Sequence, residues 1–412
     1  MTRRGPGRPR PSRARLDLAP LLPPGLSLLG LLIVAALSVG LINGQVPGLG
    51  GVGPGSSDEG GPIKTPTPSD VIVVDPRTRV PGTIAYVKTG NIWIQSGDRV
   101  YRLTNTGVDA MPSWSPDGEW IYFIRYKPVY GRFVIGGVLR GYSLQVPQVM
   151  RIRPDSDAAP ELLLTGLFKR GNQTWSYFIR QPVISPDLTR LAMVLDGPNP
   201  LQSDVVLQLF DLKTKKLSSA GAAQNRPFGH QDPAWSPDGK TLLFVKNGRD
   251  GSRGAPMLMR YTVANGKVST VAGPGYNAPS WSPDGRYIAA TRTDSLGTDV
   301  VILDARTGTE LLRVTKDARS FSGTWSPAGN AIAYLHIDRG VVDLIEVKLI
   351  GSGPSWTLAE TLPLTDAAGL DGASRPSWFI PASELPPPTP SPTPAETPTA
   401  TPLPSPLGSS SP

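Results

Sequence analysis

The 412-residue sequence contains no cysteine and only two histidines, His230 and His336. The missing cysteine excludes disulfides, thiolate metal sites, cysteine nucleophiles and a lipid-modified N-terminal cysteine. Two histidines, both expected in loops, leave little material for a metal site or a proton relay. No zinc pattern, calcium loop or phosphate-binding glycine loop is present either. The sequence therefore predicts no cofactor, no metal and no catalytic residue.

Basic charge is unevenly distributed along the chain. The net charge is +8, but residues 1–24 hold six arginines against one acid, Asp17, and so account for five of these charges. A basic segment directly before an apolar run is typical of membrane topology rather than of nucleic-acid binding. Nucleic acid is therefore not an expected partner.

The apolar run Leu26–Ile42 contains no charged residue over seventeen positions. With the uncharged residues on either side it reaches the roughly 20 residues that a transmembrane helix needs. Residues 25–44 are predicted to form a single transmembrane anchor, with residues 1–24 as a cytoplasmic tail and the rest outside. The alternative is a signal peptide cleaved near Ala36–Ser38, which would leave a secreted protein.

Proline and glycine mark two segments that cannot bury an apolar core. Residues 45–80 are a Gly/Pro-rich linker, and residues 383–412 form a Pro/Thr-rich tail predicted to be disordered and extended. The folded region is therefore expected over residues 81–382.

One phrase recurs in this region, from PSWSPDGEWIYFI at 112–124 to PSWSPDGRYIAAT at 279–291 and a truncated PSWFIPA at 376–382. Its six copies are spaced 70, 51, 46, 44 and 53 residues apart, which is typical of four-stranded propeller blades or longer units. Ser-Pro-Asp-Gly makes a turn between a short strand and an apolar one, because proline presets φ, aspartate bonds nearby amides and glycine takes a positive φ. The repeat therefore assigns structural roles to Trp114, Asp117, Asp187, Trp235, Asp238, Trp281, Asp284, Trp325 and Trp378.

Two copies of the repeat are incomplete in complementary ways. Residues 83–104 read as strands two, three and four with no preceding phrase, whereas the copy at Trp378 supplies a first strand and nothing after it. We expect the strand near Trp378 to pair with Thr83–Val87 and close the ring. The prediction is an all-β, six-bladed β-propeller of four-stranded blades.

These Ser-Pro-Asp-Gly phrases resemble the WD40-like repeats of TolB-type propellers over about 300 residues. The resemblance implies the fold and, as an expectation, a scaffold for protein contacts. TolB-like proteins also carry an N-terminal α/β domain, for which this sequence shows no counterpart, so a role in the Tol envelope system is not expected to carry over.

The second blade, which begins at Trp114, stands out by its 70-residue spacing. Its segments 125–147 and 165–182 are predicted to be long loops on one face of the ring and contain no acidic residue. Arginine combined with aromatic residues is typical of binding surfaces. The candidate binding residues are Arg125, Tyr126, Lys127, Tyr130, Arg132, Arg140, Tyr142, Lys169, Arg170, Trp175, Tyr177 and Arg180.

These features favour a noncatalytic extracytoplasmic protein that presents a basic, aromatic face to a protein or an anionic envelope polymer. One alternative is a hydrolase or lyase acting on glycan or lactone substrates at the central channel, for instance through His230 with Asp232, Asp294 or Asp338. Another is a sensory ectodomain. For the second-blade segments, the alternative is a solvated hairpin that packs its aromatic residues on its own blade.

Overall fold

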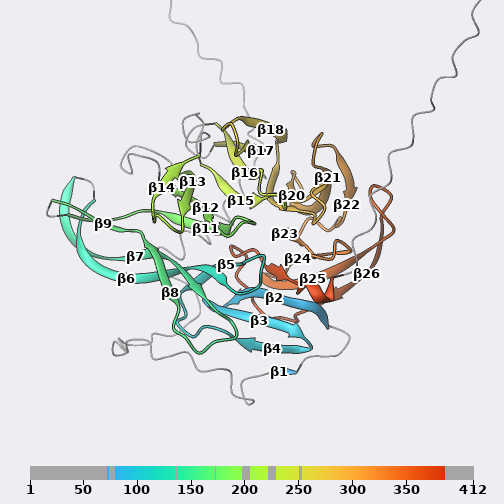
Figure 1. The fold of residues 1–412 in the computed structure, drawn as a ribbon, viewed down its shortest axis with the longest axis horizontal. Helices are drawn as coiled ribbons and strands as arrows, with labels where there is room; N and C mark the ends of the chain where they lie inside the picture. Colours follow the sequence, from blue (N-terminus) through green and yellow to red (C-terminus); the bar gives the residue numbers. More distant parts are fainter. Residues whose placement is uncertain are drawn as a thin grey trace, which may run out of the picture.

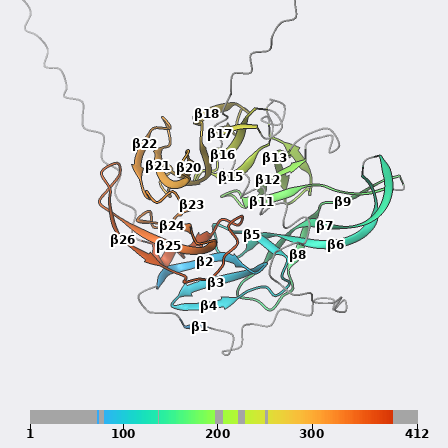
Figure 2. The same ribbon diagram turned by 180° about the vertical axis from the view of Figure 1, so that it is seen from behind.

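The computed structural model describes residues 72–73, 79–135, 137–171, 173–196, 205–220, 229–249 and 253–385. They form six antiparallel sheets arranged around a central axis and a separate two-stranded sheet, and a long two-stranded ribbon extends from one side of the ring (Figures 1 and 2). Within this part of the chain no helix is long and apolar enough to cross a membrane. The predicted anchor at 25–44 and the tail at 386–412 lie outside the described residues.

Five blades follow the order of the chain, each built as four adjacent antiparallel strands. The second blade comprises β5 (Asp109–Trp114), β6 (Ile121–Ile135), β7 (Val138–Ile152) and β8 (Glu161–Thr165). A separate hairpin, β9 (Leu167–Arg170) and β10 (Gln173–Ser176), precedes the third blade, β11 (Ile179–Ile184), β12 (Arg190–Asp196), β13 (Val205–Asp211) and β14 (Leu217–Ser219). The fourth blade comprises β15 (Gln231–Trp235), β16 (Thr241–Arg249), β17 (Arg253–Thr262) and β18 (Val268–Ala272). The fifth comprises β19 (Tyr276–Trp281), β20 (Tyr287–Thr293), β21 (Thr298–Asp304) and β22 (Glu310–Arg313). The sixth comprises β23 (Ser320–Trp325), β24 (Ala331–Asp338), β25 (Val341–Ile350) and β26 (Thr357–Pro363).

The first blade joins the two ends of the propeller, which confirms the predicted closure. Its strands β2 (Val80–Lys88), β3 (Asn91–Gly97) and β4 (Arg99–Arg102) are completed by β27 (Ser377–Phe379), with Ile84 opposite Trp378. A short strand, β1 (Ile72–Val73), adds a fifth member beside β4, although its residues fall within the range expected to be linker. A single 3-10 turn, η4 (Ala382–Glu384), follows β27.

The repeated turn works through its serine as well as its aspartate. In the fourth blade the Ser236 hydroxyl donates to Asp238 Oδ1 at 2.6 Å and accepts the Thr241 amide at 3.0 Å, while Asp238 also accepts the Lys240 amide. The second, third and fifth blades repeat this pattern. The four aspartates are therefore confirmed as turn residues, one in each of these blades.

The backbone conformation of the turn also explains why its last position is usually glycine. Gly118 has a φ of +73°, and a Cβ there would lie 2.2 Å from the Phe379 ring. In the third blade the same position is held by Leu188 at a φ of +60°. A left-handed conformation is costly for a leucine, so this turn is strained relative to the others.

Apolar strands from neighbouring blades form the core. Each repeat tryptophan is buried or half-buried, and the indole N–H groups of Trp235, Trp281 and Trp378 donate to main-chain carbonyl oxygens of Val183, Ala234 and Pro81. One cluster packs β24 and β25 against β2 and β27, so it spans the closure. The clusters draw only on residues between Val80 and Leu385. A fragment of residues 70–385 therefore contains the closed ring with its core.

Candidate functional site

The insertion in the second blade is an ordered ribbon, which corrects the expectation of long loops. Strands β6 and β7 pair along their full lengths, from Ile121 opposite Ile152 to Ile135 opposite Val138. β5 pairs with β6 only as far as Arg125, and β8 pairs with β7 only from Gln148. Residues 126–135 and 138–147, here called the arm, thus extend as a two-stranded ribbon beyond the blade, and Figures 1 and 2 both show it projecting from the ring.

The β9–β10 hairpin accounts for the other predicted loop and packs against the base of the arm. Its aromatic side chains stack on one another: the Phe168 ring lies 4.3 Å from Tyr177 and 6.5 Å from Trp175 between centroids. Tyr126 of the arm joins the neighbouring apolar cluster, and burial raises the pKa of its phenol although Arg180 is close by. About half of the aromatic set is therefore engaged in packing, as the simpler interpretation anticipated.

The candidate binding residues separate into two groups by exposure. The side chains of Lys127, Tyr130, Arg132, Arg140 and Lys169 are exposed, and Tyr130 retains 80% of its accessible surface. Arg125, Tyr126, Tyr142, Trp175, Tyr177 and Arg180 are half-buried. Arg170 belongs to β9, but its side chain lies outside the described part of the structure.

Arg125 has a structural partner that sequence reasoning missed. Its guanidinium makes two hydrogen bonds to the carboxylate of Asp109, at 2.7 and 2.9 Å, and the Asp109 side chain is fully buried. The two residues are opposite one another on β5 and β6. Sixteen residues separate them in the chain, so only the strand register brings them together. Arg125 is therefore a structural residue rather than an available binding group.

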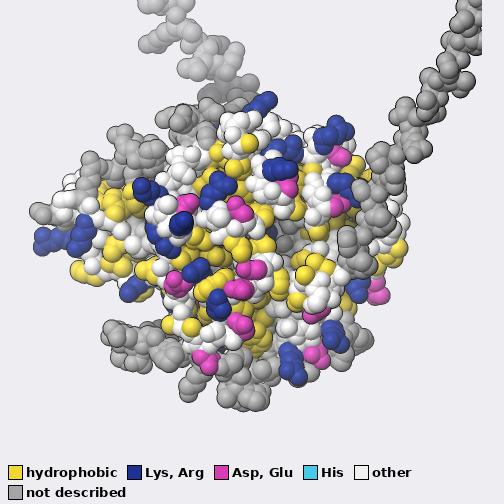
Figure 3. All heavy atoms as spheres, in the orientation of Figure 1, with side chains coloured by type: hydrophobic (Ala, Val, Ile, Leu, Met, Phe, Trp, Pro, Cys, Tyr) yellow, Lys and Arg dark blue, Asp and Glu magenta, His cyan; other side chains and the backbone are white. Residues whose placement is uncertain are grey.

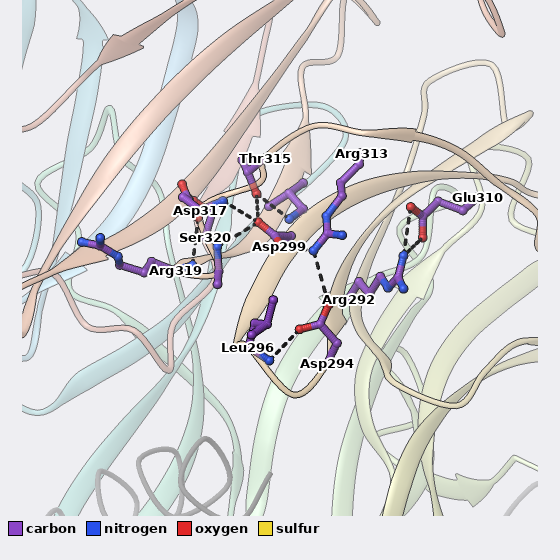
Figure 4. A network of polar contacts seen from close by, with 12 residues as sticks. Arg292, Asp294, Leu296, Asp299, Glu310, Arg313, Thr315, Asp317, Arg319 and Ser320 are labelled. Atoms are coloured by element: carbon purple, nitrogen blue, oxygen red, sulfur yellow. Dashed lines mark hydrogen bonds and ion pairs between the residues drawn. The ribbon is translucent and has the colours of Figure 1, made fainter. Parts of the chain in front are cut away.

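Two arginines of the fifth blade are neutralised in the same way. Figure 4 shows Arg313 between Asp294 and Asp299, and Arg292 on Glu310 at 3.0 Å. Asp299 also accepts the Thr315 hydroxyl and two main-chain amides, and although burial opposes ionisation, these bonds and Arg313 hold its pKa below the usual range. Arg292 and Arg313 are thus bound to local carboxylates.

The exposed cations of the arm and of β9 have no such partner. No ion pair joins Lys127, Arg132, Arg140 or Lys169 to an acid within the described residues. No aspartate or glutamate occurs in the sequence between Glu119 and Asp155. In Figure 3 the end of the molecule where the arm lies carries Lys and Arg next to hydrophobic side chains, and the acidic side chains lie over the body of the ring.

The central channel offers a second candidate site. A cavity of about 490 Å³ runs along the inner strands and is bordered by repeat tryptophans, turn prolines and Arg375. The Arg375 guanidinium bonds to the carbonyl oxygens of Pro233 and Pro279, so it crosses between two blades inside the channel. Loss of hydration lowers the pKa of Arg375, and the charge of Asp232 opposes this shift.

A repeated β-bulge shapes the inner strands around this channel. In five blades the register shifts at one residue with a φ of 47° to 56°, at Met111, Gln181, Asp232, Ala278 and Ser322. The side chain of one bulge residue receives the next blade's bulge amide: Gln181 accepts from Asp232 at 2.8 Å, and Asp232 accepts from Ala278 at 3.0 Å. These polar groups therefore hold neighbouring blades together.

The two histidines do not join the channel carboxylate. His230 is fully buried, accepts the Leu207 amide through Nδ1 at 3.0 Å and packs on Phe244. His336 lies in strand β24 rather than in a loop, and its Nδ1 is near both Ser320 and Asp317. Serine and aspartate approach the same ring nitrogen here, whereas in a catalytic triad they contact different nitrogens of the imidazole. No group of three His, Asp or Glu side chains suited to a metal was found among the described residues.

Comparisons with known proteins agree with this architecture. The TolB β-propeller domain model matches residues 167–360. TolB from Acinetobacter baumannii is 19% identical, with a TM-score of 0.52, over 73% of this chain and 67% of that chain. A putative TolB from Agrobacterium tumefaciens is 16% identical, with a TM-score of 0.51, over 74% and 94%. No curated protein matches. At these identities the solved structures support the fold alone, and the expected TolB-type propeller is confirmed.

Proposed function

We propose that this TolB-like six-bladed β-propeller is a noncatalytic extracytoplasmic binding scaffold, whose arm presents a basic surface to an acidic segment of a protein partner. The observation that carries the proposal is a group of exposed cations on the arm and β9, in two stretches of sequence, 120–154 and 162–186, that contain no acidic residue. Lys127, Arg132, Arg140 and Lys169 make no ion pair within the described residues, whereas Arg292 and Arg313 of the ring are held by carboxylates. Such unpaired charges attract an acidic surface at long range and set the salt dependence of binding.

The ring holds this surface in a fixed position. Because the arm continues strands β6 and β7 of the second blade, its base is anchored in the sheet and by the β9–β10 hairpin. A preorganised surface loses less conformational entropy on binding than a flexible loop would. The noncatalytic assignment is supported by the channel lining, in which Asp232 is the one carboxylate among the described residues.

Binding of labelled poly-L-glutamate, a soluble model of an acidic polypeptide, tests the proposal by fluorescence anisotropy over a series of salt concentrations. Reversing Arg132, Arg140 and Lys169 to glutamate should weaken binding at least about tenfold at low salt and flatten the salt dependence. The same measurement with a polyphosphate probe distinguishes a polypeptide partner from an anionic polymer.

A matched control exists on the third blade. Lys213, Lys215 and Lys216 are exposed in the turn between β13 and β14, so their reversal changes the net charge by the same amount. This control should retain most of the binding. Equal losses in both variants would show that only the overall charge matters, and the arm would no longer be assigned as the interaction surface.

A further inference from the structure

The tip of the arm combines an exposed apolar end with a layered arrangement of arginine and tyrosine. Val138 and Leu139 keep 50% and 43% of their accessible surface, and Gly137, directly before them, lies in the turn. The sequence from 133 to 139, FVIGGVL, contains no charge and is bracketed by Tyr-Gly-Arg at 130–132 and Arg-Gly-Tyr at 140–142. Apolar residues gathered at the end of a projecting ribbon are costly in water unless something covers them.

Because β6 and β7 pair residue by residue, the similar residues on either side of the turn lie at similar distances from the tip; each pair of opposite residues is here called a level. Val138 and Leu139 occupy the two levels at the turn, opposite Ile135 and Val134. Arg140 and Arg132 occupy the next two levels, opposite Phe133 and Gly141. Tyr142 and Tyr130 follow, opposite Gly131 and Ser143. At roughly 3.3 Å per residue, the arginines stand about 10 Å or less from the end of the tip.

The two arginines lie on opposite faces of the ribbon. Arg140 shares a face with its cross-strand partner Phe133, and Phe133 is next to Arg132 in the same strand, where side chains alternate between faces. A protein groove would contact one face of the ribbon and leave the other arginine in water. A lipid bilayer entered end-on surrounds both faces at the same depth. Its acyl chains, phosphates and headgroup region match apolar, arginine and tyrosine levels in that order.

We propose that the arm tip inserts end-on into the surface of an anionic phospholipid bilayer. Val138 and Leu139 enter the acyl-chain boundary, Arg132 and Arg140 bind phosphates, and Tyr130 and Tyr142 lie among the headgroups. Depths of about 5–10 Å are typical of amphipathic segments that bind at membrane interfaces. This contact shares Arg132 and Arg140 with the acidic partner proposed above, but it alone requires the apolar end of the arm.

The test uses the fragment 70–385, which contains the closed ring and lacks the predicted anchor. Co-sedimentation with vesicles of phosphatidylglycerol and phosphatidylcholine should show binding, and vesicles of phosphatidylcholine alone should bind more weakly. Replacing Val138 and Leu139 with serine keeps every charge and should lower vesicle affinity at least about tenfold, because the inserted apolar area is lost. Leu162→Ser with Ile350→Ser provides the control, since these apolar residues are equally exposed on β8 and β25.

Insertion itself can be observed because the chain has no cysteine of its own. An environment-sensitive fluorophore on Leu139→Cys should shift to shorter wavelength with anionic vesicles and be quenched by spin-labelled lipids, whereas the same label on Leu162→Cys should not respond. Absence of vesicle binding, or of any response at position 139, overturns the proposal. So does vesicle binding that the serine variant retains in full, which would indicate surface electrostatics alone.

Two further outcomes separate the alternatives. If sedimentation without lipid shows a dimer that the serine variant abolishes, a second copy of the chain covers the tip, and the bilayer proposal is wrong. If the serine variant loses vesicle binding but still binds poly-L-glutamate, the membrane contact and the protein-binding function are distinct. The charge variant should weaken both poly-L-glutamate and vesicle binding, because Arg132 and Arg140 serve both contacts, so the serine variant is the one that separates the two proposals.

Discussion

Replacing His230 with asparagine should remove most of the pH dependence of stability between pH 7 and pH 5. The wild-type ring is fully buried, Nδ1 accepts the Leu207 amide, and Phe244 packs against it at 4.8 Å. A proton on Nδ1 would face another N–H group and carry a charge into the core. Burial, with a smaller effect of Lys246, lowers the pKa of His230 from 6.5 to about 3.

The sign follows from proton linkage. Above pH 7 both the folded and unfolded states hold a neutral imidazole, and the full stability is present. As pH falls through 6.5 the unfolded state takes up a proton that the folded state refuses, so the free energy of unfolding decreases until the pH reaches the folded pKa. The loss is about 2 kcal/mol between pH 7 and pH 5 and about 5 kcal/mol when complete.

Urea unfolding of fragment 70–385 at pH 7, 6 and 5 measures this loss, with the His230→Asn variant compared with itself across pH. Asparagine keeps an acceptor for the Leu207 amide but removes the titrating ring. Glu346, whose pKa is raised by burial, contributes with the opposite sign in both proteins, so its effect cancels in the comparison. A His336→Asn background leaves His230 as the single histidine. Parallel pH profiles for the two proteins would refute the assignment.

Three other substitutions test the architecture by chemical unfolding. Leu188→Gly should raise stability by about 1 kcal/mol by relieving a left-handed turn, whereas Leu188→Ala, which keeps a Cβ, should not. Trp378→Ala should cost about 3–5 kcal/mol, because it removes a buried ring at the closure together with its bond to Pro81; a loss below 1 kcal/mol would show that the ring closes without it. Asp299→Ala should cost about 3 kcal/mol by leaving two main-chain amides and the Thr315 hydroxyl without their acceptor, although Arg313 keeps Asp294. Replacing the half-buried turn residue Asp304 in the same way should cost about 1 kcal/mol, and equal losses at the two sites would contradict the importance of burial.

The fold of the ring could be predicted because short stretches of sequence determine the strands and turns of each blade. Each Ser-Pro-Asp-Gly phrase encodes a strand, a turn and a second strand within a few residues, and the defects at Thr83 and Trp378 were complementary. The structure confirms six blades and their closure. Even the serine at the turn, whose bonds were not anticipated, acts on residues at most five positions away.

The arm was misjudged for a physical reason. The loop expectation came from the 70-residue spacing of the second blade, which shows that residues are inserted but not whether they pair as strands; Pro128 and several glycines also lie in the segment. Pro128 is accommodated because β5 no longer pairs with β6 at that level, and its missing N–H faces an open edge. Partners such as Asp109 for Arg125 depend on strand register, so a count of charges along the chain could not separate structural cations from available ones.

The difference between paired and unpaired cations shows how a repeat fold can acquire an interaction surface. On the ring, a cation can meet a carboxylate supplied by the adjacent strand, as Arg125 of β6 meets Asp109 of β5. The arm continues beyond β5 and β8, where no neighbouring strand can supply an acid. Its cations are therefore unpaired because of its length, and a shortened second blade would lose both the charge and the apolar tip together. Deleting residues 128–145 should thus abolish poly-L-glutamate and vesicle binding while leaving the ring, whose core lies elsewhere, folded.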